Sequence, residues 1–277
     1  MEQPAERKAK EPSDGCKHER ANQHDDRPIG SRAKRDRATG KAKWTADVPG
    51  TATEDRYAGY LREHGYASHT PVSDGEAVYV FFGKAGVLAF DMAGKQLWQT
   101  SVGTQSDVRG WGSAASPILH GKLVIVNASS EGRAVVALDK ATGKQVWKET
   151  GTKLSLSFGS PALVKAGDRF DLVVAMPALV WGLDPDTGKQ RWTTAIKPDG
   201  NISPTVVPGD GVAYIYGGYQ TKGSLAVKAG GTGDVKPEWS AKSSSYVPTP
   251  ALAGGKLYCV TDEGFAQCVN AADGKVI

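Results

Sequence analysis

The sequence predicts an all-β fold, and more narrowly a β-propeller with about five four-stranded blades. Glycine and proline together supply 49 of the 277 residues, so turn signals recur along the chain. The middle of the chain is rich in Val, Tyr and Trp, which favour strands. A third observation is a repeat with a period near 45 residues, which is the length of a propeller blade.

The repeat is marked at both ends of each unit. A hydroxyl residue followed by proline opens five segments: Thr70-Pro71, Ser116-Pro117, Ser160-Pro161, Ser203-Pro204 and Thr249-Pro250. A tryptophan closes five similar segments: Trp44, Trp98, Trp147, Trp192 and Trp239. Between these marks lie apolar runs and turns, and the unit ends on Asp-x-x-Thr-Gly-Lys-x-x-Trp. The pattern predicts four strands per unit, with the tryptophan on the fourth.

Each repeated residue type has a structural role to match. Proline lacks an N–H donor, which is tolerated in the first strand, at the inner edge lining the channel. The aspartates Asp91, Asp139 and Asp184 can accept backbone N–H bonds and hold the turn before the fourth strand. The glycines of these turns are expected to take positive φ: Gly94, Gly143, Gly188 and Gly274. The tryptophans are expected to pack in the seams between blades. The fourth unit departs from the pattern, because AVKAGGTGDVKPEW replaces the aspartate-led turn.

Residues 1–42 are predicted to be a disordered, basic and polar tail, because they hold few large apolar side chains. Residues 43–277 are predicted to form the propeller. Its blades are expected at about 67–99, 112–148, 156–193, 200–240 and 246–277, with 39–47 as a stray outer strand. The run SRAKRDRATGKAK invites a nucleic-acid interpretation, but a solvated tail explains it as well. Because the rest of the chain is close to neutral, no nucleic-acid partner is predicted.

The two ends of the repeat leave the ring unresolved. Residues 39–44 match the tail of a unit whose start is absent, and the chain ends at Ile277, before the next expected tryptophan. One explanation is an incomplete ring. The other is a closed ring of five, in which residues 39–47 supply the outer strand of the last blade. The sequence favours the incomplete ring.

The Asp-x-x-Thr-Gly-Lys-x-x-Trp units resemble the PQQ-like (pyrroloquinoline quinone-type) propeller repeat over about residues 44–277. That repeat occurs in quinoprotein alcohol dehydrogenases and in BamB-like outer-membrane assembly lipoproteins. The resemblance implies a ring of seven or eight blades. It also implies a non-enzymatic scaffold that binds protein partners in the periplasm or cell envelope. The sequence has no transmembrane segment, and its N-terminus lacks the apolar stretch of a signal peptide, so the location stays open.

Two other functions fit the same repeat. A quinoprotein dehydrogenase would need PQQ, calcium, a catalytic aspartate and usually two adjacent cysteines. Adjacent cysteines are absent from the sequence and Asp107 stands without a matching motif, so no cofactor and no catalytic residue are predicted. A propeller that senses a small ligand or glycan is the third interpretation. Surface aromatic residues in two or more adjacent loops would favour that interpretation over the protein scaffold.

The candidate binding residues lie in loops that should gather at one mouth of the channel. They are His64, Tyr66, His69, Arg109, Trp111, Asn201 and Tyr246. Arg109 beside Trp111 could hold an anionic or planar ligand, or could simply pack on a tryptophan between blades. His69 could transfer protons or bond a neighbouring loop. The insertion that contains Tyr57 and Tyr60 could form a lid, either for a partner or for packing.

The three cysteines do not have the spacing of a zinc site. Cys259 and Cys268 flank the sequence TDEG. A two-residue loop at Glu263-Gly264 would place them opposite each other, within disulfide range. A register shift of one residue would separate them, and the sequence does not decide between the two arrangements.

Overall fold

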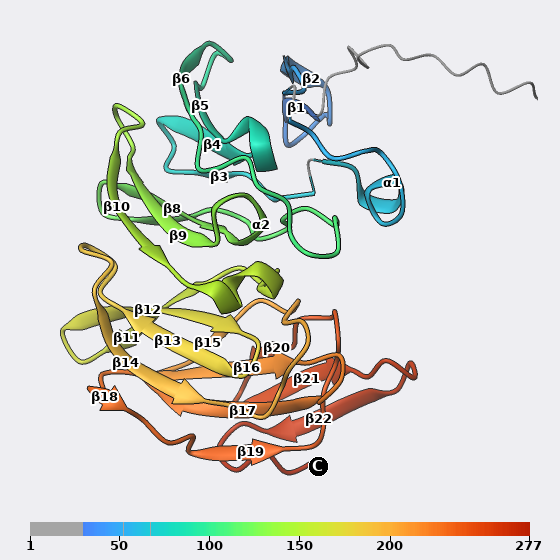
Figure 1. The fold of residues 1–277 in the computed structure, drawn as a ribbon, viewed down its shortest axis with the longest axis vertical. Helices are drawn as coiled ribbons and strands as arrows, with labels where there is room; N and C mark the ends of the chain where they lie inside the picture. Colours follow the sequence, from blue (N-terminus) through green and yellow to red (C-terminus); the bar gives the residue numbers. More distant parts are fainter. Residues whose placement is uncertain (1–29, 52, 67) are drawn as a thin grey trace, which may run out of the picture.

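The computed structural model describes residues 30–51, 53–66 and 68–277. Five antiparallel sheets follow one another in an arc from the upper to the lower end of the molecule, and each is a blade (Figure 1). The propeller prediction is therefore confirmed. The arc does not close into a ring.

The strands follow the sequence order within each blade. Blade one holds β3 (Val72–Ser73), β4 (Ala77–Phe81), β5 (Val87–Asp91) and β6 (Gln96–Thr100). Blade two holds β7 (Ile118–His120), β8 (Leu123–Ala128), β9 (Ala134–Asp139) and β10 (Gln145–Thr150). Blade three holds β11 (Ala162–Ala166), β12 (Arg169–Met176), β13 (Leu179–Leu183) and β14 (Gln190–Ala195), with β18 (Gly233–Asp234) parallel to β14. Blade four holds β15 (Val207–Pro208), β16 (Val212–Gly217), β17 (Gly223–Lys228) and β19 (Trp239–Ala241). Blade five holds β20 (Ala251–Ala253), β21 (Lys256–Val260) and β22 (Ala266–Asn270).

Short helices occur only in connections within the described ranges. They are α1 (Leu61–His64), η1 (Gly83–Ala85), α2 (Ser129–Gly132) and η2 (Thr152–Leu156). None of the described helices has the length and apolarity needed to cross a membrane.

The core lies between the blades, and β8 shows why. Every residue of this strand is buried. Val124 and Val126 pack with residues of blade one, whereas Leu123 and Ile125 pack with residues of blade three. Because successive side chains of a strand point to opposite faces, one apolar run supplies two seams. The apolar middle strands of the repeat therefore require a neighbouring blade on each side.

A tryptophan fastens one blade to the next at four seams. The indole Nε1 of Trp98 donates to the carbonyl of Lys140 at 2.8 Å, and that of Trp147 donates to the carbonyl of Pro185 at 3.0 Å. Trp44 and Trp239 bond the carbonyls of Met92 and Ala271 in the same way. In each case the acceptor follows the first residue of the next turn. The seam role predicted for these four tryptophans agrees with this packing.

The turn glycine is needed at the same seam, both for its backbone and for its lack of a side chain. Gly188 has a φ of +72°, and a Cβ on it would lie 2.5 Å from the Trp147 ring. Gly143 over Trp98 and Gly274 over Trp239 repeat the arrangement, with φ values of +70° and +73°. The repeated glycine is therefore fixed by two independent requirements.

Gly188→Ala is expected to lower the free energy of unfolding by about 3 kcal/mol, because it adds a clash with Trp147 to the cost of a positive φ. The matched control is Gly167→Ala. Gly167 has a φ of +64° but nothing within 4 Å of its Cβ position. The control should cost only about 1–2 kcal/mol. Urea denaturation measures both values, and equal losses would show that the tryptophan contact contributes nothing.

Residues 30–48 form a hairpin, which differs from the prediction of a disordered tail up to residue 42. β1 (Gly30–Arg35) pairs with β2 (Ala42–Val48), and Asp36 accepts the N–H groups of Ala38 and Thr39 in the turn. The turn is thus a full copy of the repeat motif, since Asp36 occupies its first position. Residues 1–29 of the predicted tail lie outside the described residues.

The hairpin packs on blade one and forms a two-stranded sheet of its own. The Trp44 ring lies 5.8 Å from Phe90, and Val48 packs in a cluster with Val80 and Leu88. In the described part of the chain β2 pairs with β1 and not with β22, so it is not the outer strand of blade five, and the closed ring of five is wrong. At the other end, Val269 of β22 forms an isolated bridge with Val276, and no fourth strand covers β22 among the described residues.

Blade three has a different anchor. The Trp192 indole donates to Asp171 Oδ2 at 2.7 Å instead of to the next blade. The backbone N–H of Gly230 in blade four donates to the same oxygen, also at 2.7 Å. The aspartate-led turn that blade four lacks is thus replaced by a buried carboxylate in blade three.

The two cysteines of blade five do not pair. Cys259 lies opposite Gln267, and Cys268 lies opposite Tyr258. The connection is the five-residue loop 261–265, not a two-residue turn. This register differs by one residue from the one needed for a disulfide, so the two thiols point to opposite faces and are free. The possible disulfide is therefore wrong.

Candidate functional site

Two sets of loops, taken from all five blades, emerge on one face of the arc, and we call it the loop face. Antiparallel strands alternate in direction, so the connections between blades and the connections between second and third strands emerge at the same end. The first set is 49–71, 101–117, 151–161, 196–206 and 242–250. The second set is 82–86, 129–133, 177–178, 218–222 and 261–265. All seven predicted site residues lie on the first set.

An aromatic cluster forms on this face around Trp111. The Tyr60 ring meets the Trp111 ring edge-on, with centroids 4.8 Å apart, and Phe158 lies 5.7 Å away. The guanidinium carbon of Arg109 lies 4.9 Å from the Trp111 ring centre and 5.8 Å from that of Tyr219. Arg109 thereby links a loop of blade two to a loop of blade four.

Blade five extends the cluster. The Tyr246 ring lies 5.4 Å from Tyr219, and its hydroxyl accepts a hydrogen bond from Asn201 Nδ2 at 2.7 Å. The backbone N–H of Tyr246 is held by Asp262, which also pairs with Lys222. Four predicted residues, Arg109, Trp111, Asn201 and Tyr246, therefore belong to one continuous group of contacts. The cluster residues are Tyr60, Arg109, Trp111, Phe158, Asn201, Tyr219 and Tyr246.

The loop that carries Arg109 and Trp111 is held by a buried carboxylate. Asp107, which is 5% exposed, accepts the backbone N–H of Arg109 at 2.8 Å through Oδ1. Its Oδ2 accepts the N–H groups of Trp111 at 3.0 Å and Gly112 at 2.9 Å. Asp107, the carboxylate that a dehydrogenase function would have called on, thus holds the shape of this loop.

His69 lies beneath the face and not on it. It is 1% exposed, stacks on Phe81, and its Nε2 lies 3.1 Å from Ser113 Oγ. Ser113 in turn donates to Glu131 Oε1 at 2.8 Å. The serine sits between the histidine and the acid, so this order is not that of a catalytic triad, in which the histidine is central. Of the two roles considered for His69, the contact with a neighbouring loop agrees with this geometry.

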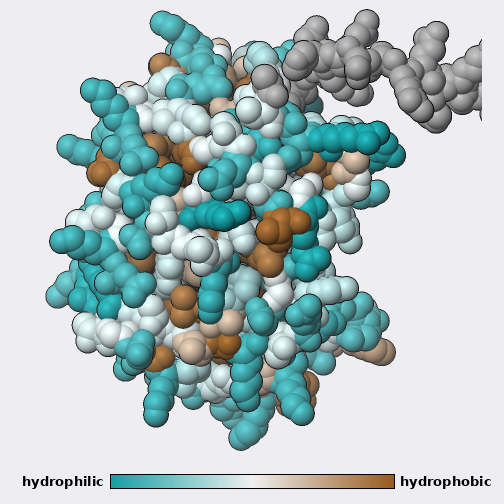
Figure 2. All heavy atoms as spheres, in the orientation of Figure 1, coloured by the Kyte–Doolittle hydropathy of each residue, from teal (hydrophilic) through white to brown (hydrophobic). Residues whose placement is uncertain are grey.

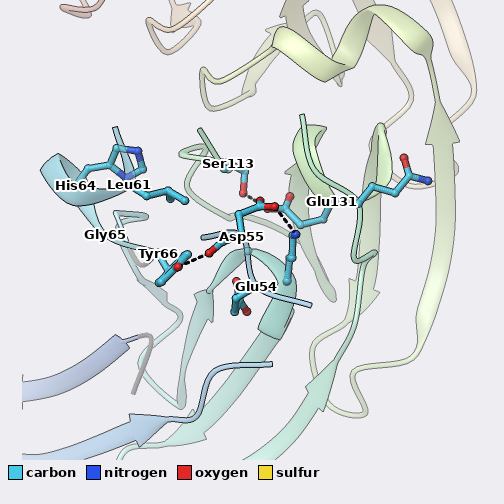
Figure 3. A pocket seen from close by; sticks show the side chains of 12 residues that line it. Glu54, Asp55, Leu61, His64, Gly65, Tyr66, Ser113 and Glu131 are labelled. Carbon is cyan, nitrogen blue, oxygen red and sulfur yellow. Dashed lines mark hydrogen bonds and ion pairs between the residues drawn. The ribbon is translucent and has the colours of Figure 1, made fainter. Parts of the chain in front are cut away.

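His64 and Tyr66 line a small cavity of about 20 Å³ beside the cluster (Figure 3). Lys84 is 8% exposed and reaches across it to Asp55 at 3.0 Å, to the carbonyl of Thr53 and to Ser106. Tyr66 donates to the carbonyl of Asp55. The space holds about one water molecule. These contacts fix the insertion against η1 through Thr53 and Asp55, and Tyr66 bonds Asp55 within it, whereas His64 is exposed and only lines the cavity.

Sequence reasoning missed Tyr219, Lys84 and Glu131. All three lie on connections between second and third strands, whereas the prediction considered only the loops between blades. The signal was present, because Gly217-Gly218-Tyr219 interrupts an apolar run in the middle of its unit. Alternation of strand direction would have placed that loop on the same face.

The sequence matches the PQQ_2 family model, described as outer membrane protein assembly factor BamB, over residues 32–277. The chain belongs to this family. BamB from Moraxella catarrhalis has a similar structure, with a TM-score of 0.62 at 15% identity, covering 86% of this chain and 66% of that one. A quinohemoprotein alcohol dehydrogenase from Comamonas testosteroni gives a TM-score of 0.54 at 17% identity, covering 76% of this chain and 42% of that one. These likenesses show the fold alone.

One curated relative is a dehydrogenase. The quinoprotein ethanol dehydrogenase of Pseudomonas aeruginosa is 29% identical over an alignment of 150 positions, and the match covers 47% of this chain and 23% of the relative. This PQQ_2 family chain thus spans less than a quarter of that relative's length, and 66% of the BamB structure.

The described residues do not fit the calcium and quinone of such enzymes. No group of three or more His, Cys, Asp or Glu side chains in the described part of the chain could hold a metal ion. Asp107 is already occupied by three backbone N–H groups. The chain's cysteines are not adjacent in sequence.

Proposed function

We propose that this PQQ_2 family chain is a non-enzymatic scaffold that binds a protein partner in the cell envelope through its loop face. The observation that carries the proposal is the exposed aromatic and arginine cluster. Tyr60 and Tyr219 keep 55% and 53% of their surface exposed although they contact other rings. Tyr, Trp and Arg are the residues that dominate binding energy at protein interfaces. The family's description as an outer membrane protein assembly factor supports a partner of that assembly process.

The cluster is broad, and this favours a protein over a small ligand. Exposed aromatic residues on adjacent loops are the feature expected to favour a small-ligand or glycan sensor, and Tyr60 and Tyr219 supply it. Sites of that kind, however, are concave and enclose most of the ligand. Here the apolar exposure continues away from the cluster to Val108 and Val247, which are 74% and 58% exposed on neighbouring loops. Figure 2 shows an apolar area at mid-height of the visible face, bordered by hydrophilic side chains.

Photo-crosslinking in the native cells tests this proposal. A benzophenone amino acid placed at Tyr219 is expected to give a discrete protein adduct that mass spectrometry identifies. The matched control is the same residue at Leu97, which is 50% exposed on the outer strand β6, away from the loop face. Adducts of equal yield at both positions, or adducts only at Leu97, would contradict a binding role for the loop face.

A further inference from the structure

The positive charge of Arg109 has no counterion within the described residues. Its side chain is exposed, forms no ion pair and donates no hydrogen bond to any of them. By contrast, Arg191 pairs with both Asp171 and Asp184. Among the residues that the structure describes, the guanidinium of Arg109 contacts the rings of Trp111 and Tyr219.

These ring contacts leave the donors of Arg109 available. An arginine that lies over an aromatic ring presents the flat face of its guanidinium to the ring, whereas its N–H groups point outward in the plane. That outward fork matches the two oxygens of a carboxylate. The exposed ring of Tyr219, which Arg109 contacts, and that of Tyr60, which contacts Trp111, offer apolar surface in the same cluster.

The site is also organised before any ligand arrives. Asp107 fixes the backbone on both sides of Gly110, which has a φ of +64°. On the opposite side, Asp262 fixes the backbone of Tyr246, whose ring packs at a tilt against Tyr219. A ligand would therefore meet a cation and rings that are already in place, which lowers the ordering cost of binding.

We propose that Arg109, Trp111 and Tyr219 receive one carboxylate of the partner protein, an Asp or Glu side chain that lies next to a bulky apolar or aromatic residue. The carboxylate accepts two hydrogen bonds from the Arg109 fork, and the apolar neighbour lies against Tyr60 and Tyr219. This assignment rests on the proposed function and names the chemistry that its loop face recognises.

The test uses 3-phenylpropanoate as the probe and 3-phenylpropanamide as its uncharged isostere. Both are titrated into the full chain while the indole N–H signal of Trp111 is followed by NMR, after assignment with Trp111→Phe. The carboxylate is expected to bind at least tenfold more tightly than the amide. Arg109→Gln should remove this preference, and Arg109→Lys should keep part of it because the charge remains but the fork is lost.

The matched control is Arg37→Gln, which removes an exposed arginine from the turn at the opposite end of the strands. It should keep the full preference for the carboxylate. Equal binding of acid and amide to the unmodified chain would overturn the inference, as would a preference that survives Arg109→Gln. A neutral oligosaccharide that binds tightly without Arg109 would assign the site to glycans instead. A protein adduct at Tyr219 in the crosslinking experiment, together with equal binding of acid and amide, would support the scaffold function and reject only the carboxylate site.

Discussion

Asp171→Asn is expected to destabilise the chain by about 3–5 kcal/mol, because it breaks a buried charged anchor between blades three and four. Asp171 is fully buried. Its carboxylate accepts hydrogen bonds from the Trp192 indole, the Gly230 N–H and the Arg191 guanidinium, each at 2.7 Å. An asparagine side chain would direct an N–H₂ group at one of these donors. It would also remove one of the two negative charges that pair with the Arg191 guanidinium.

Urea denaturation measures the effect, and Asp186→Asn is the control. That substitution makes the same chemical change at a side chain that is 72% exposed and pairs only with His120. It should cost less than about 1 kcal/mol. Similar losses for the two variants would mean that the contacts of Asp171 do not hold the seam.

Glu131→Gln is expected to stabilise the chain at alkaline pH and to change little in acid. Glu131 is 2% exposed, and its Oε2 has no hydrogen-bond partner among the described residues. Burial, with a smaller contribution from Asp107, raises the pKa of Glu131 to about 7 from an ordinary value of 4.5. Between these values the folded chain keeps a proton that the unfolded chain has lost. Stability therefore falls as the pH rises from about 4.5 to about 7, and then stays level.

The loss over that interval corresponds to about 3 kcal/mol. Glutamine carries no charge at any pH, so the variant should gain up to about that amount at pH 8 and almost nothing at pH 4.5. Denaturation curves of both chains across this range give the difference directly. A stability gain of Glu131→Gln that is the same at every pH would contradict the raised pKa of Glu131. Glu63→Gln, at an exposed position on α1, should stay within about 0.5 kcal/mol of the unmodified chain.

The repeat allowed the fold to be predicted because its signals are local. The bond between a turn aspartate and the N–H groups that follow it depends on residues two or three positions apart, as at Asp139. The same signal extends to Asp36, which lies inside the predicted tail. The predicted outer strand began only at residue 39, because the few large apolar residues before Trp44 suggested disorder. Apolar surface of blade one around Phe90 supplies the packing that those residues lack.

The cysteines illustrate a different limit. Their pairing depended on whether the loop after β21 has two residues or five, since one step of register moves a side chain to the other face. The turn sequence TDEG fits more than one hairpin. The contacts of the whole blade determine the register, and these are not visible in a short stretch of sequence.

The sequence by itself determined the blade repeat, the turns and the seam tryptophans, because each is encoded by neighbours along the chain or by a period that repeats. Only the tertiary structure decided what meets at the loop face. Arg109 and Tyr219 are 110 positions apart in the sequence, in blades two and four, and come together because the blades curve around a common centre. The tertiary structure also decided that His69 and Glu131 are buried, since the depth of a loop residue is set by the loops that cover it.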